Sequence, residues 1–152
     1  MTELKPVTLE NLHQRTLQQI FDWVVYSLLN QGEQCSDDEF GCMYHNEDLR
    51  CAAGHCISDK EYHELQSKLV GDKKFIHGIE NKPISRVIAK SNEVLGTVVP
   101  DETRMRLMQS LQEVHDRLYV SCWVSEFNRI AEEFGFDTII LDHFEELENE
   151  QV

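Results

Sequence analysis

The sequence predicts a mainly α, α+β fold: a single compact helical domain with a small β-hairpin inserted after its first helix. Apolar residues recur at three- and four-residue steps in several segments, between residues that start and end helices. One short stretch after the first helix instead places apolar and aromatic residues on either side of turn formers. The 152 residues show no internal repeat or long linker. We therefore expect one domain over 1–136 and an acidic tail over 137–152, with helix allowed in part of that tail.

The first helix is expected over 8–31, within TLENLHQRTLQQIFDWVVYSLLNQG, with Thr8 as its N-cap and Gly32 as its end. The acidic, turn-forming stretch 33–41 predicts a loop. Next, CMYHNEDLR (42–50) favours a short hairpin that turns at NED. The following CAAGHCI (51–57) either continues the second strand or begins a short buried helix.

Four further helices are predicted after the hairpin. The first begins at a capping box formed by Ser58 and Glu61, and the second has Pro83 in its first turn. Asp101 or Thr103 caps the third, which has an apolar stripe along one face. The expected ranges are 58–70, 83–95, 103–118 and 120–134.

The charge of the chain limits the kinds of partner it can have. There are 14 Lys and Arg against 28 Asp and Glu, a formal net charge of −14. Such a chain is unsuited to holding nucleic acid through phosphate contacts, and its partner surface is expected to be basic. We see no signal peptide and no apolar run of the ~20 residues that a membrane span needs. A cytoplasmic location with five reduced cysteines is therefore expected.

The segment FGCMYHNEDLRCAAGHCI (40–57) concentrates cysteine and histidine. A tetrahedral zinc site needs four nitrogen or sulfur ligands, and Cys42, His45, Cys51 and either His55 or Cys56 have a spacing that permits one. The same residue types also bury readily in a reduced core, where cysteine behaves as a small apolar residue. The spacing leaves both interpretations open. We favour the core, because motif matches of this looseness are often false.

Cys51 is also a candidate nucleophile, since a helix starting beside it would favour the thiolate. His55 or His115 would act as its base, and Asp116 or Asp59 would orient that histidine. Against this, His115 lies on the apolar stripe of its helix, where a histidine of the core is more common. The alternative function is thus a cysteine-dependent hydrolase or a zinc-dependent enzyme built on residues 42–56.

Part of the chain resembles a family of small proteins encoded by tailed phages and prophages. The pattern is Cys-x-Tyr, a turn, a basic residue, Cys-Ala-x-Gly, a helix opened by Asp that contains Tyr, and later Leu-Gln-x-x-His-Asp. The resemblance covers residues 8–136 and implies an accessory protein that acts on the bacterial host or its defence systems. The matching positions are Cys42, Tyr44, Arg50, Cys51, Ala52, Gly54, Ile57, Asp59, Tyr62, Leu111, Gln112, His115 and Asp116.

The interpretation we favour is a binding protein that is not an enzyme and needs no cofactor. Its acidic surface would contact a basic host or defence protein in the bacterial cytoplasm, with DNA mimicry as the extreme form. We also expect Cys42, Tyr44, Cys51 and His115 to meet in one cluster. That cluster would hold the hairpin against helix 103–118, because a two-stranded ribbon is marginal alone.

Overall fold

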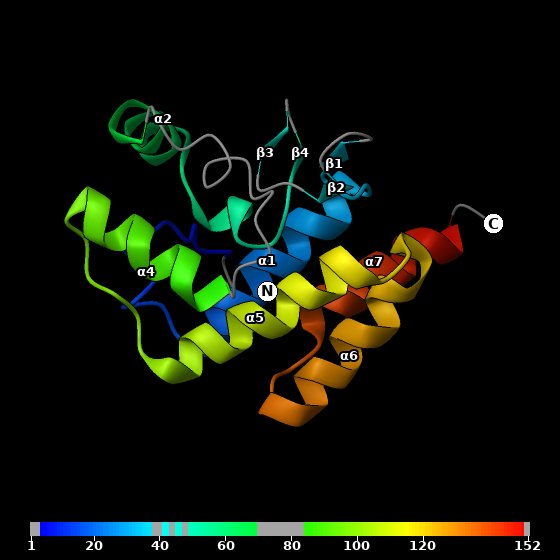
Figure 1. The fold of residues 1–152 in the computed structure, drawn as a ribbon. Helices are drawn as coiled ribbons and strands as arrows, with labels where there is room; N and C mark the ends of the chain where they lie inside the picture. The colour runs from blue at the N-terminus through cyan, green and yellow to red at the C-terminus, as the bar shows by residue number, and fades with distance from the viewer. Residues whose placement is uncertain (1–3, 38–40, 43–44, 47–48, 70–83, 151–152) are drawn as a thin grey trace.

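The computed structural model describes residues 4–37, 41–42, 45–46, 49–69 and 84–150, with the backbone alone at 36–37, 41–42, 45–46 and 145–150 (Figure 1). It is mainly helical and forms one compact body, as predicted. Two short 3₁₀ helices, Gly54–Cys56 and Val120–Cys122, join longer elements. The longer elements are α1 (Leu17–Gln31), β1 (Ser36–Asp37), β2 (Gly41–Cys42), β3 (His45–Asn46), β4 (Leu49–Arg50), α2 (Asp59–Lys68), α4 (Ile84–Leu95), α5 (Glu102–Arg117), α6 (Trp123–Phe134) and α7 (Ile139–Glu150).

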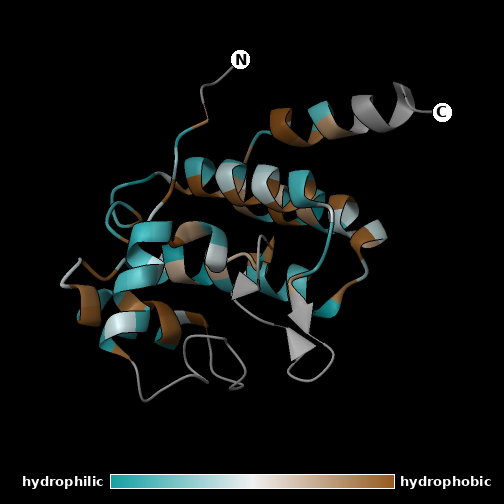
Figure 2. Cartoon of the chain, turned by 90° about the horizontal axis from the view of Figure 1, so that it is seen from above, coloured by the Kyte–Doolittle hydropathy of each residue, from teal (hydrophilic) through white to brown (hydrophobic). Residues whose placement is uncertain are grey.

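Helix α5 lies at the centre of the fold and contacts α1, α4 and α6. Helix α7 packs on α1 and α6, while α2 packs on α4. The helices carry both hydrophobic and hydrophilic residues (Figure 2), as expected of elements that cover a shared core. Phe21, Leu111 and Trp123 are fully buried there. Within the described ranges, none of the helices is long and apolar enough to span a membrane.

Helix α1 begins at Leu17, so the predicted start at Thr8 is wrong. A capping box decides the start: the Thr16 side chain accepts from the backbone N–H of Gln19, and the Gln19 side chain accepts from the N–H of Thr16. Thr8 instead closes a separate turn through its carbonyl group. The end at Gly32 is as predicted, in the left-handed region at φ 70°.

The predicted hairpin is present, and a second strand pair precedes it. Strands β3 and β4 are antiparallel, with His45 opposite Arg50. Strands β1 and β2 pair Ser36 with Cys42, so the expected loop over 33–41 is wrong at the strand residues. The CAAGHCI segment forms a turn and the 3₁₀ helix Gly54–Cys56. Of the two predicted alternatives, a continued strand and a short buried helix, the structure therefore has the helix.

The four later helices match the predicted positions closely. The Ser58 and Glu61 capping box starts α2, and Asp101 caps α5 through its side chain. Helix α2 ends at Lys68, and the expected stop at 71 lies outside the described residues, as does Pro83. Helix α6 starts at Trp123, because a 3₁₀ turn occupies the residues before it.

The expected acidic tail is helical over Ile139–Glu150. Leu141 is fully buried in the core, and the rings of Tyr26 on α1 and Phe144 on α7 lie 5.7 Å apart. The expectation of a solvated tail therefore does not hold for Leu141. The packed body extends past residue 136 at least to that residue.

Candidate functional site

Cys51 lies in the core and is fully buried. Its Sγ accepts a hydrogen bond from the backbone N–H of Gly54 at 3.3 Å. Burial nevertheless dominates and raises the pKa of the Cys51 thiol well above its usual range, with the nearby Asp116 and Cys35 adding to the effect. The local helix therefore does not produce the thiolate that a nucleophile needs.

His115 is fully buried and both of its ring nitrogens have partners. Nε2 accepts from the backbone N–H of Cys35 at 2.9 Å, so Nδ1 carries the proton and donates to Asp116 Oδ1 at 2.7 Å. The ring centroid lies 5.8 Å from that of Trp123. The lone pair that a general base would use is thus engaged by Cys35, and Asp116 orients a histidine with a structural role.

Gln112 lies one turn before Asp116 on α5 and joins the same network. Its Oε1 accepts from the buried N–H of Ala53 at 2.9 Å, and its Nε2 donates to Asp116 Oδ1 at 2.8 Å. We call the side chains of Gln112, His115 and Asp116, with the N–H groups of Cys35 and Ala53, the polar lock. The polar lock holds the segments at Cys35 and Ala53 against helix α5, through hydrogen bonds that span 80 and 59 positions of the sequence.

His55 faces α1 rather than α5. Its Nε2 donates to Gln31 Oε1 at 2.9 Å, and its carbonyl group accepts from Trp23 Nε1 at 2.8 Å. The side-chain amide of Gln31 also makes two hydrogen bonds to the Arg50 backbone: Nε2 donates to its carbonyl oxygen and Oε1 accepts from its N–H, each at 2.9 Å. Asp59 forms an ion pair with the Arg50 guanidinium. Asp59 therefore orients Arg50, and His55 holds the segment on the end of α1.

The predicted zinc ligands that are described do not form a metal site together. Cys56 is buried, its Sγ lies 3.9 Å from the Met108 sulfur, and burial raises the pKa of its thiol. Among the described side chains, no three of His, Cys, Asp or Glu are grouped so that they would hold a metal ion. The side chains of Cys42 and His45 lie outside the described atoms, and a zinc site that uses them stays a prediction.

The four cysteines with described side chains are free thiols. Three of them are buried and Cys122 is exposed. Reduced thiols were expected from the odd number of cysteines and the lack of export signals. Cys42 lies outside this set.

The predicted packing cluster is described only in part. Cys51 and His115 are both fully buried, and the polar lock ties their segments together. The side chain of Cys42 and all of Tyr44 lie outside the described atoms. Sequence reasoning missed Cys35 and Gln34, whose Nε2 donates to the carbonyl group of His115 at 2.7 Å. Their setting in a polar stretch after Gly32 indicated only a loop.

Some of the described residues that carry the phage resemblance make contacts within or to residues 50–59. Arg50 pairs with Asp59, and Gln112 bridges the Cys-Ala-x-Gly turn to Asp116. They form a structural framework around residues 50–59. No protein-family model, curated protein or solved structure matches this chain.

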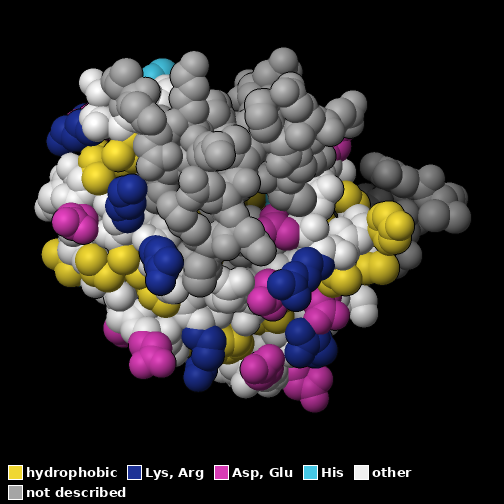
Figure 3. All heavy atoms as spheres, in the orientation of Figure 1, with side chains coloured by type: hydrophobic (Ala, Val, Ile, Leu, Met, Phe, Trp, Pro, Cys, Tyr) yellow, Lys and Arg dark blue, Asp and Glu magenta, His cyan; other side chains and the backbone are white. Residues whose placement is uncertain are grey.

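Exposed carboxylates gather where α6 ends and α7 begins. We call Glu132, Glu133, Asp137 and Asp142 the acidic edge; the stretch 130–152 contains no Lys or Arg. All four are exposed. Burial raises the pKa of the neighbouring Asp22, a hydrogen bond from a Gln side chain lowers it, and the charge of Asp137 raises it further. By contrast, basic and acidic side chains are interspersed on the face seen in Figure 3.

Proposed function

We propose that this is a binding protein without catalytic chemistry at Cys51, whose acidic surface contacts a basic protein and modulates it by occupying its surface. The observation that carries the proposal is the concentration of charge near the end of the chain. From Glu126 to Val152 there are nine acidic residues and a single basic one, Arg129. A field of one sign speeds encounter with a partner of the opposite sign.

The burial of the cysteine segment supports binding over hydrolysis. Cys51 is sealed from solvent, its pKa is raised, and His115 is held by Cys35 and Asp116. A substrate would have to enter the core to reach the thiol. The hydrogen bonds of the polar lock are better suited to stabilising the fold than to catalysing hydrolysis.

The phage resemblance favours a particular class of partner, a basic protein of the bacterial host or of a defence system. If that partner normally binds DNA, the acidic edge would occupy its DNA site. This special case makes a separate prediction: duplex DNA would compete with the protein for the partner.

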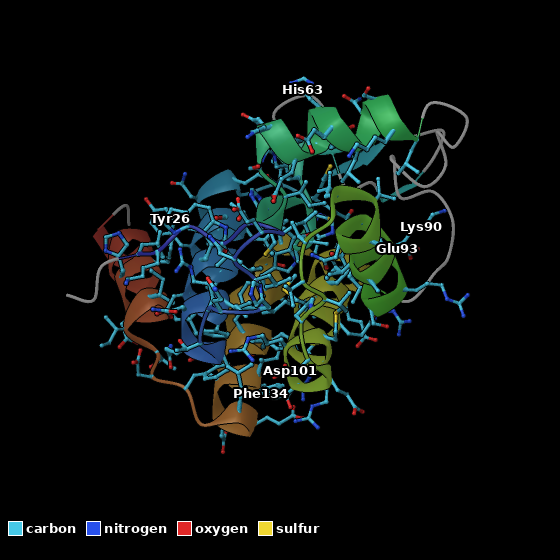
Figure 4. All side chains as sticks on the ribbon, turned by 90° about the vertical axis from the view of Figure 1, so that its left-hand side faces the viewer. Tyr26, His63, Lys90, Glu93, Asp101 and Phe134 are labelled. Atoms are coloured by element: carbon cyan, nitrogen blue, oxygen red, sulfur yellow. The ribbon has the colours of Figure 1, made fainter. Side chains whose placement is uncertain are left out.

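The test compares wild type with two variants that have the same net charge as each other. The edge variant carries Glu132→Lys, Glu133→Lys and Asp142→Lys; Asp137 is kept because its carboxylate accepts from the N–H of Ile139 at 3.4 Å at the start of α7. The control variant carries three reversals at exposed positions elsewhere, which gives it the same net charge. Those control substitutions are Glu33→Lys, Glu93→Lys and Glu113→Lys, of which Glu93 on α4 is labelled in Figure 4.

Each form is immobilised and exposed to a bacterial lysate at low and high salt, and the retained proteins are identified. We expect wild type and control to retain the same basic proteins at low salt, and the edge variant to lose them. The retained protein is then purified and titrated against all three forms by calorimetry. Equal losses in the edge and control variants would exclude the edge as the contact surface, and a wild type that retains no basic protein would refute the proposal.

A further inference from the structure

We draw no further inference here: the strongest candidate, the groove of about 350 Å³ between the segment before β1 and the α5–α6 connection, where Tyr119 is 85% exposed beside Val120, is a surface patch for which nothing in the described parts of the chain shows what covers it.

Discussion

Replacement of Gln112 by Leu tests whether the polar lock holds the fold together. Gln112 is 6% exposed and uses both ends of its amide, accepting from the Ala53 N–H and donating to Asp116. Leucine has a similar reach along α5 and can make neither bond. The substitution therefore leaves the Ala53 N–H buried without this acceptor and removes one donor from the Asp116 carboxylate.

The expected loss of stability follows from these two bonds. A buried N–H left without a partner costs about 1–3 kcal/mol. The lost bond to Asp116 adds less, about 1 kcal/mol, since that side chain is 36% exposed and water replaces part of the interaction. Allowing about 1 kcal/mol for the apolar surface that leucine buries, the net loss is about 2 kcal/mol. For a domain of this size the melting temperature should fall by about 6 °C.

The measurement is urea unfolding followed by circular dichroism, with thermal melts beside it. Gln66→Leu on α2 is the matched control, because Gln66 is half-buried on a helix and makes no side-chain hydrogen bond to the described residues. Amide exchange of Ala53 should accelerate in the Gln112 variant only. A Gln112→Leu protein as stable as the control, or one in which Ala53 exchange is unchanged, would refute the structural role of the lock.

Three further predictions follow from burial and charge. Cys51→Ala should lower stability by about 1–2 kcal/mol, and Cys51→Ser should lower it more because a hydroxyl is buried; unchanged urea midpoints would return Cys51 to the functional candidates. In the native protein, a thiol reagent should modify Cys122 within minutes and the three buried cysteines only on unfolding, as peptide mass mapping can show. Asp22→Asn should raise stability at pH 7 by less than about 1 kcal/mol, because the raised pKa of Asp22 penalises its ionised form. As the pH falls through that raised pKa the difference from Asp22→Asn should begin to shrink, and it should vanish below the lower pKa of the unfolded state, where Asp22 is protonated in both states; a constant difference would contradict the assignment.

The helices were predictable because the signals that place them are local. The Ser58 and Glu61 box, the Asp101 cap and the stop at Gly32 each act within one turn, and the structure uses all of them. The start of the first helix failed for an equally local reason. Thr16 and Gln19 form the same kind of box as Ser58 and Glu61, and the apolar residues before them had suggested a longer helix.

The polar lock could not be predicted from the sequence, because its hydrogen bonds join residues that lie far apart along the chain. Gln112 reaches Ala53 and His115 reaches Cys35, across 59 and 80 positions. Cysteine and histidine close together in sequence suggested shared chemistry. In the fold His55 faces α1 while His115 faces the Cys35 segment, so the two histidines serve different contacts.

Asp22 shows how the fold brings an acidic residue of α1 close to one of the acidic edge. Its carboxylate accepts from Gln18 Nε2 at 2.9 Å, and Gln18 Oε1 accepts from the Asp137 N–H at 3.0 Å, so one glutamine holds two acidic residues near each other. Burial, and to a smaller extent repulsion from Asp137, raise the pKa of Asp22, so the folded state carries an unfavourable free-energy contribution that an asparagine would remove. The cost falls on the folded state alone, because in the unfolded chain Asp22 is hydrated and far from Asp137. The pH series on Asp22→Asn therefore measures how strongly this contact between α1 and the start of α7 opposes folding.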